Sequence, residues 1–181
     1  MRKIFLFMLV SVDGYFEGPD HDISWHNVDA EFNDFANNQL GEIGTLLFGR
    51  RTYDLMASFW PTSKSATAQF MNALPKVVVS HSAFQPEWEN TTVISADVIE
   101  DVRKLKAQAG KDIAIFGSNT LCVSLMEAGL VDEFRIMTCP VALGKGTSLF
   151  AGLSKRMKFH LTKQREFNSG NLLRYYAIIN I

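Results

Sequence analysis

An unbroken apolar run opens the chain and predicts its first strand, Ile4–Val10. No polar residue alternates within the run, so we expect the strand to be buried on both faces, as in parallel sheets. The strand ends at a turn signal, Asp13-Gly14. A polar loop with one glycine, a proline and three acidic residues follows over 15–27.

Strand-like and helix-like segments alternate along the rest of the chain. Apolar residues at helical spacing predict helices at 29–39, after Gly49, and at 66–74, 97–109 and 120–128. Short apolar or β-branched runs predict strands at 45–48, 76–79, 92–94, 112–116, 132–139, 157–167 and 171–180. The turn signal Asn168-Ser169-Gly170 joins the last two strands as a hairpin.

This order of elements predicts an α/β fold with three layers, α/β/α. Its sheet is mixed and mainly parallel, with about eight strands and an antiparallel C-terminal hairpin. No repeat or linker interrupts residues 1–181, so we expect a single domain.

Composition narrows the function classes. The 181 residues are 47% apolar and carry 18 basic against 19 acidic side chains, a net charge of −1. This balance disfavours nucleic-acid and membrane-surface partners. The first apolar run resembles a signal peptide after Arg2-Lys3, but it is far shorter than the roughly 20 residues that span a bilayer. We therefore expect a cytoplasmic protein whose two cysteines, Cys122 and Cys139, are reduced and buried.

Candidate chemistry gathers where predicted strands end, since ligands of such sheets bind at the carboxyl ends of strands and at helix N-termini. One turn holds Gly49, Arg50, Arg51 and Thr52, whose guanidinium groups suit phosphate. The two others are Gly117-Ser118-Asn119-Thr120 and Ser80-His81-Ser82. A single turn of this kind is usually an ordinary connection with a helix cap. Three at one sheet edge favour a polyphosphate ligand such as a dinucleotide, although the three-glycine fingerprint after the first strand is absent.

The same turns carry a resemblance to a known family. The chain resembles the dihydrofolate reductase-like superfamily, and within it the C-terminal reductase domain of the bifunctional riboflavin-biosynthesis deaminase/reductase (the RibD C-terminal domain family). The resemblance runs nearly end to end, and the matching stretches are residues 11–14, 48–53, 79–82, 115–118, 130–134, 140–146 and 149–150.

The resemblance implies an NADPH-dependent reductase of a small heterocyclic substrate. It implies that the adenosine half of NADPH is held by residues of two turns, Gly49, Arg50, Arg51, Thr52, Ser80, His81 and Ser82. The pyrophosphate would be held by Gly117, Ser118, Asn119 and Thr120, and the nicotinamide would be bordered by Asp13 and Gly14. Two arginines fit a phosphorylated ribose better than a diol, which favours NADPH over NADH.

Catalytic and substrate candidates are fewer. In dihydrofolate reductases a carboxylate early in the first helix supports protonation of the pterin, and here Glu31 is the nearest counterpart. Glu31 could equally complement the helix dipole, and Asp13 could simply build a turn. Trp25 is a candidate wall for a flat heterocycle, and Gly144 a candidate contact to substrate.

Three alternatives stay open. The reaction could resemble reduction of 5-amino-6-(5-phosphoribosylamino)uracil or of a dihydropterin, or the chain could bind NADP(H) without turnover. His21 and His26 lie near two aspartates but have no third ligand of clear spacing, so we predict no metal site. The resemblance also makes a homodimer plausible.

Overall fold

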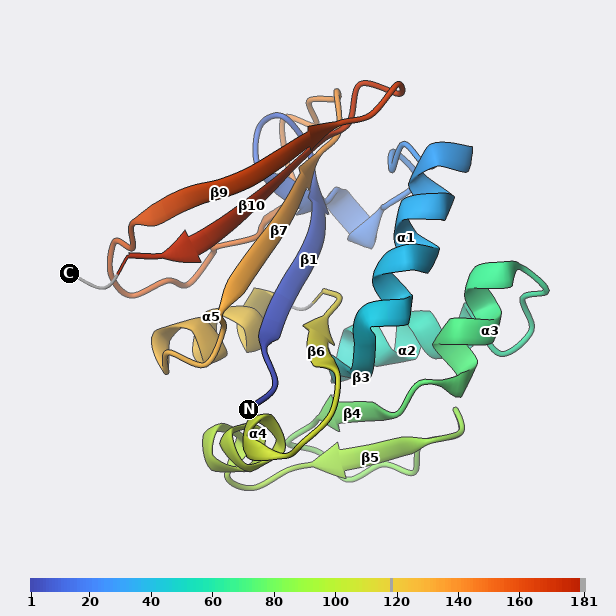
Figure 1. Ribbon diagram of the computed structural model, residues 1–181, viewed down its shortest axis with the longest axis vertical. Coiled ribbons are helices and arrows are strands. Elements are labelled where there is room, and N and C mark those ends of the chain that lie inside the picture. Colours follow the sequence, from blue (N-terminus) through green and yellow to red (C-terminus); the bar gives the residue numbers. More distant parts are fainter. Residues whose placement is uncertain (118, 180–181) are drawn as a thin grey trace.

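A computed structural model describes residues 1–117 and 119–179. Its centre is an eight-stranded sheet in the order β5-β4-β3-β6-β1-β7-β10-β9 (Figure 1). Its strands are β1 (Ile4–Val10), β3 (Ile43–Gly49), β4 (Lys76–Val79), β5 (Thr91–Ile94), β6 (Asp112–Ile115), β7 (Glu133–Thr138), β9 (Phe159–Glu166) and β10 (Leu172–Ile178). The five pairings from β5 to β7 are parallel, and β10 runs antiparallel to both β7 and β9. The predicted mixed α/β sheet with its antiparallel C-terminal hairpin is confirmed.

Helices cover both faces of the sheet and make the three predicted layers. They are α1 (Ala30–Glu42), α2 (Arg50–Phe59), α3 (Ala66–Ala73), α4 (Val98–Ala107) and α5 (Asn119–Glu127). Strand β1 is buried along its whole length and divides its side chains between two cores. Ile4 and Leu6 pack with residues of α4 and α5, whereas Phe5 and Phe7 pack with residues of α1, α2 and α3. The strict alternation of side chains in a strand produces this division.

The structure departs from the predicted elements mainly in the loop 15–27. This segment contains a short strand, β2 (Tyr15–Glu17), and a 3₁₀ turn, η1 (Pro19–His21). Strand β2 pairs with β8 (Thr147–Ser148) in a separate two-stranded sheet. Strands of two and three residues carry too little periodicity to be recognised in a sequence.

The end of helix α4, the state of the two cysteines and the presence of membrane-spanning helices were also addressed by the sequence. Helix α4 ends at Ala107, two residues before the predicted end, because Gln108 is already extended (ψ 159°). Cys122 and Cys139 are free and buried, as predicted. Among the described residues, no helix is both long enough and apolar enough to cross a bilayer.

Candidate functional site

The sheet order places the predicted turns side by side. Strands β4, β3, β6 and β1 are consecutive neighbours in the sheet and run parallel, so their carboxyl ends share one edge. The turns after these strands begin at Ser80, Arg50, Phe116 and Ser11 respectively. The candidate site is therefore assembled by four strands that are not consecutive in the sequence.

The starts of α2 and α5, together with β2, line an open cavity of about 210 Å³, which we call the α2–α5 pocket. It is lined by Phe16, Glu17, Arg51, Thr52, Asn119 and Thr120. The last four are residues that the sequence assigned to a phosphate-bearing ligand. Ser118, assigned with them, lies outside the described residues.

Gly117 brings the two turns into contact. Its backbone has a φ of +92°, and a Cβ added there would lie 2.9 Å from Cγ2 of Thr52. Any side chain at this position would therefore overlap the first turn of α2, besides straining the backbone. Glycine allows the loop after β6 to contact Thr52, a residue that lines the α2–α5 pocket.

The start of α2 is also open to an anion. The N-termini of α1, α3 and α4 are capped by the side chains of Asp29, Ser65 and Asp97. Among the described residues, no side chain caps α2, whose N-cap is Gly49. The free N–H groups and the positive end of the helix dipole at such a terminus attract phosphate oxygens.

The two arginines of this turn differ in their surroundings. Arg50 donates Nε to both carboxylate oxygens of Asp54 at 2.8 Å, and its guanidinium lies 3.7 Å from the ring centre of Phe84. Arg51 has a side chain that is 75% exposed and approaches only Glu17 as an ion pair among the described residues, at 4.0 Å. Arg51 is therefore the guanidinium that can reach a ligand in the α2–α5 pocket.

Glu17 is a pocket residue that the sequence did not indicate. Its side chain is 9% exposed although it belongs to the segment predicted as a polar loop. It accepts a hydrogen bond from Oγ1 of Thr147 at 2.7 Å and lies 3.0 Å from Nδ1 of His21. The carboxylate thus sits at the rim of a pocket whose other polar groups suit an anion.

The turn after β4 stands next to this pocket. The Ser80 hydroxyl is buried and donates to the carbonyl of Ser82 at 2.8 Å, which shapes the turn. His81 and Ser82 are exposed. Because Arg50 stacks on Phe84, two residues further along, the turn after β4 is joined to the start of α2. A ligand that extends from the α2–α5 pocket toward the turn after β4 would meet His81 and Ser82.

Asp13 joins the end of β1 to a distant loop. Its carboxylate accepts hydrogen bonds from the Ser11 hydroxyl at 2.6 Å and from the backbone N–H groups of Leu143 and Gly144. These bonds, led by that of Ser11, lower the pKa of Asp13 to about 2. Asp13 and Gly144, predicted in different roles, are therefore direct partners, and the carboxylate is ionised and structural in this arrangement.

Glu31 lies apart from the α2–α5 pocket. It caps the hairpin turn between β9 and β10 by accepting from the N–H of Asn168 and from Nη2 of Arg165, both at 2.8 Å. These two bonds lower the pKa of Glu31, the bond from Asn168 most. A proton donor needs a pKa close to the working pH, so these contacts disfavour the predicted catalytic role.

The Trp25 side chain is half-buried. Its indole N–H donates to the carbonyl of Asp22, and its ring packs edge-on against His26 at 4.6 Å. The indole is thereby oriented by its own loop. Its predicted contact with a substrate stays a prediction.

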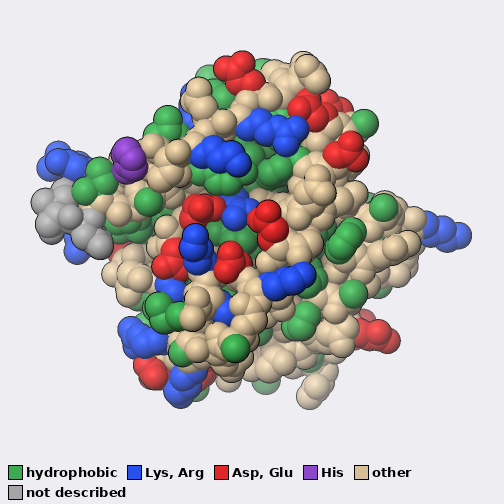
Figure 2. Space-filling view, viewed as in Figure 1, with side chains coloured by type: hydrophobic (Ala, Val, Ile, Leu, Met, Phe, Trp, Pro, Cys, Tyr) green, Lys and Arg blue, Asp and Glu red, His purple; other side chains and the backbone are tan. Residues whose placement is uncertain are grey.

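A second cavity lies on the face of the sheet, away from the carboxyl edge. Charged side chains of both signs gather in the middle of this face (Figure 2). They surround a hollow of about 310 Å³ lined by Glu42, Glu133, Arg135, Thr162, Lys163 and Tyr175.

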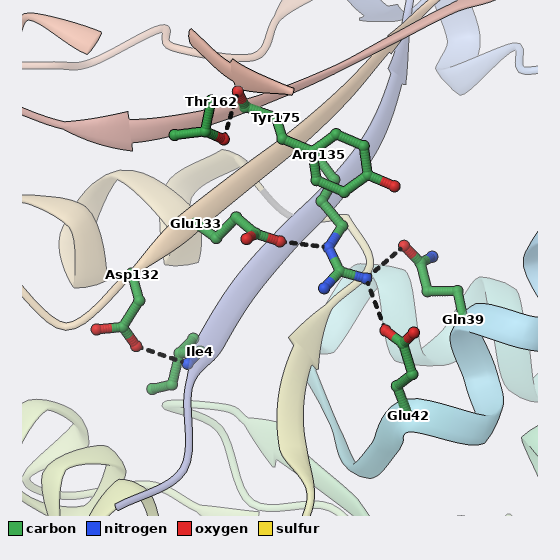
Figure 3. A network of polar contacts seen from close by, with 8 residues as sticks. All are labelled: Ile4, Gln39, Glu42, Asp132, Glu133, Arg135, Thr162 and Tyr175. Atoms are coloured by element: carbon green, nitrogen blue, oxygen red, sulfur yellow. Dashed lines mark hydrogen bonds and ion pairs between the residues drawn. The ribbon is translucent and has the colours of Figure 1, made fainter. Parts of the chain in front are cut away.

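Arg135 is the centre of this charged group. It donates to Glu133 at 2.6 Å and Gln39 at 3.1 Å, and it approaches Glu42 at 3.4 Å (Figure 3). Its guanidinium also lies 3.7 Å from the ring centre of Phe5. A guanidinium so fully engaged supports packing of α1 on the sheet and leaves little capacity for a ligand.

Comparisons with known proteins identify the family of this chain. The model of the RibD C-terminal domain matches residues 2–173, so the chain belongs to the RibD C-terminal domain family. It is 33% identical over 177 residues to the uncharacterized protein YyaP of Bacillus subtilis (strain 168), covering 93% of this chain and 91% of that protein.

Two solved structures share the fold. A candidate riboflavin biosynthesis protein from Shewanella sp. PV-4 superposes with a TM-score of 0.78 at 20% identity, covering 98% of this chain and 99% of the other. Dihydrofolate reductase from Enterococcus faecalis, complexed with NADP(H) and RAB-propyl, gives a TM-score of 0.68 at 14% identity, covering 98% of this chain and 97% of the other. The predicted branch is confirmed by the family match, and both solved structures share the predicted fold.

Proposed function

We propose that this protein is an NADPH-dependent reductase of a small heterocyclic substrate, related to 5-amino-6-(5-phosphoribosylamino)uracil. The observation that carries the proposal is the convergence of Arg51, Thr52, Asn119 and Thr120 on one pocket at the carboxyl edge. The NADP(H) bound by the dihydrofolate reductase with the same fold supports the choice of cofactor.

The donors around the pocket fit a pyrophosphate. The uncapped start of α2 supplies backbone N–H groups, and Thr52, Asn119 and Thr120 supply hydroxyl and amide donors. Gly117 packs against Thr52, and this contact leaves no room for a side chain. A pyrophosphate held here would be bound by groups from two helices at once.

Selectivity for the phosphorylated cofactor is assigned to Arg51 and to the turn after β4. Arg51 is exposed and its planar fork can donate two parallel bonds to a 2′-phosphate. The Arg50–Phe84 stack orients the turn that carries Ser80, His81 and Ser82. We place the adenosine half of the cofactor between these two turns.

NADPH supplies the hydride when bound, and the protein supplies position. Asp13 orders the loop at the end of β1 by binding Leu143 and Gly144, which fixes the border that we assign to the nicotinamide. The reduced substrate carbon would lie against this border, near Trp25. The proton would come from water, because hydrogen bonds lower the pKa of both Asp13 and Glu31.

A second candidate is a protein that binds NADP(H) without turnover. The engagement of both carboxylates favours it, since a reductase acting on a pterin needs a proton donor near the substrate. The two candidates share the α2–α5 pocket and differ only in catalysis.

The deciding experiment is a turnover screen. Oxidation of NADPH is followed by its absorbance in the presence of ribosylaminopyrimidines and dihydropterins. Substrate-dependent oxidation supports the reductase. Binding of NADPH without oxidation by either substrate class supports the second candidate.

A further inference from the structure

One of the side chains that line the α2–α5 pocket is itself an anion, the carboxylate of Glu17. The carboxylate of Glu17 lines the pocket beside Arg51, Thr52 and the start of α5, and it is nine-tenths buried. A carboxylate repels a phosphate at short range, so its presence among phosphate-binding groups needs an explanation.

The backbone holds Glu17 in this place. Strand β2 pairs with β8, with Glu17 opposite Thr147. A Cβ added to Gly146 would overlap the carbonyl oxygen of Glu17, and Gly146 has a φ of +151°. The two strands therefore approach as closely as only glycine permits. This packing and the Thr147 hydroxyl hold the carboxylate away from solvent, and the same oxygen, Oε1, lies 4.0 Å from Nη1 of Arg51.

We propose that Glu17 is an internal counter-anion for Arg51, which a phosphorylated ligand must displace from the guanidinium. The inference rests on the proposed function, because it assigns Arg51 to the phosphates of NADPH. Glu17 would then be a specificity-determining residue, and it would lower the affinity of the pocket for anions in general.

The contacts allow this exchange of partners. Arg51 reaches Glu17 only at 4.0 Å and is otherwise exposed, so its side chain can turn to a ligand. Glu17 would keep the Thr147 hydroxyl and the imidazole of His21 after Arg51 leaves. The buried carboxylate would therefore keep two polar partners, which limits the cost of losing Arg51.

The exchange would also discriminate between anions. Inorganic phosphate could gain Arg51 but few other groups, so Glu17 would compete with it effectively. A dinucleotide adds the start of α2, Thr52, Asn119 and Thr120, and these extra contacts offset the displacement of Glu17.

The test compares wild type with Glu17→Gln, which keeps the shape and an acceptor for Thr147 but removes the charge. Titration followed by calorimetry should show NADPH binding tightened about three- to tenfold, and inorganic phosphate binding tightened or newly detectable. Glu42→Gln is the matched control, since it removes one carboxylate that lines the other cavity and should leave both affinities unchanged. Melting curves check that each variant is folded.

The Arg51→Ala background separates exchange from simple repulsion. If Glu17 acts by occupying Arg51, the gain from Glu17→Gln should shrink below about twofold when Arg51 is absent. A gain that persists in this background overturns the exchange. Wild-type binding of NADPH with no tightening by Glu17→Gln also overturns it, and leaves the proposed function standing. Absence of NADPH binding in wild type and variant alike overturns the proposed function, and the exchange falls with it.

Discussion

Gly117 lies against Thr52, so the loop after β6 and the start of α2 form one wall although they are far apart in the sequence. A Cβ on Gly117 would come within 2.9 Å of Cγ2 of Thr52 and within 3.2 Å of its hydroxyl. Both residues belong to turns that the sequence assigned to the same cofactor. Their contact makes the two turns a single site.

Replacing Gly117 with alanine should therefore damage stability and binding together. The Gly117→Ala variant should lose about 1–3 kcal/mol in the free energy of unfolding, from a positive φ and from overlap with Thr52. NADPH binding should weaken because Thr52 must move. The matched control is Gly129→Ala, which has a φ of +69° but open space around the added Cβ. If both variants lose the same stability and neither loses NADPH affinity, the Gly117–Thr52 wall has no part in binding.

Replacement of Arg51 and replacement of Arg50 should have different effects on cofactor binding. Arg51→Ala should weaken NADPH roughly tenfold to a hundredfold and NADH much less, because the proposed partner is the 2′-phosphate. Arg50→Ala should act mainly on stability, since Arg50 is engaged by Asp54 and Phe84. Arg103→Ala, at an exposed ion pair on α4, serves as the control for lost charge. Equal losses for NADPH and NADH in Arg51→Ala would contradict the assignment.

The difference between these arginines shows where sequence reasoning reaches its limit. Apolar runs predicted inner strands such as β1 and β3, because a strand buried on both faces needs apolar residues throughout. Strand β9 is largely exposed and polar, and the turn signal at 168–170 helped to predict it. The parallel order of the inner strands predicted the sheet edge at which the candidate site lies. The sequence treated Arg50 and Arg51 alike, although the spacing of Arg50 and Asp54 was a visible signal of an ion pair along a helix.

Glu17 marks what the sequence could not show. Its burial depends on the pairing of β2 with β8 and on the close approach of Gly146, which join segments far apart in the chain. An acidic residue in a polar loop gives no sign of such a partner. The role of Glu31 could not be read either, because its partners Arg165 and Asn168 come from the C-terminal hairpin.

Glu31 should prove to be a structural residue. Glu31→Gln should lower the melting temperature, because the hydrogen bonds from Arg165 and Asn168 lose the carboxylate charge. NADPH affinity should stay unchanged, and Glu87→Gln, at an exposed loop position, should leave both quantities unchanged. An unchanged melting temperature together with a large loss of turnover would restore the catalytic role.

Asp13 should make stability depend on acid pH. Its pKa is about 2 in the folded protein, against an ordinary value of 3.8. Because folding depresses the pKa, the stabilisation is fully present above the ordinary value and is lost as the pH falls through the folded value. Melting temperature measured between about pH 4 and pH 2 should fall less steeply in Asp13→Asn than in wild type. Asp34→Asn, exposed on α1, should reproduce the wild-type slope; identical slopes in all three proteins would contradict the role of Asp13.

The central claim is that the α2–α5 pocket binds the phosphates of NADPH, and a fluorescence titration tests it most directly. Wild-type protein is titrated with NADPH, and NADH is titrated in parallel under the same salt conditions. The account predicts saturable binding with a clear preference for NADPH. No binding of either cofactor would mean that the chain shares the fold of these reductases without their cofactor, and would contradict the account.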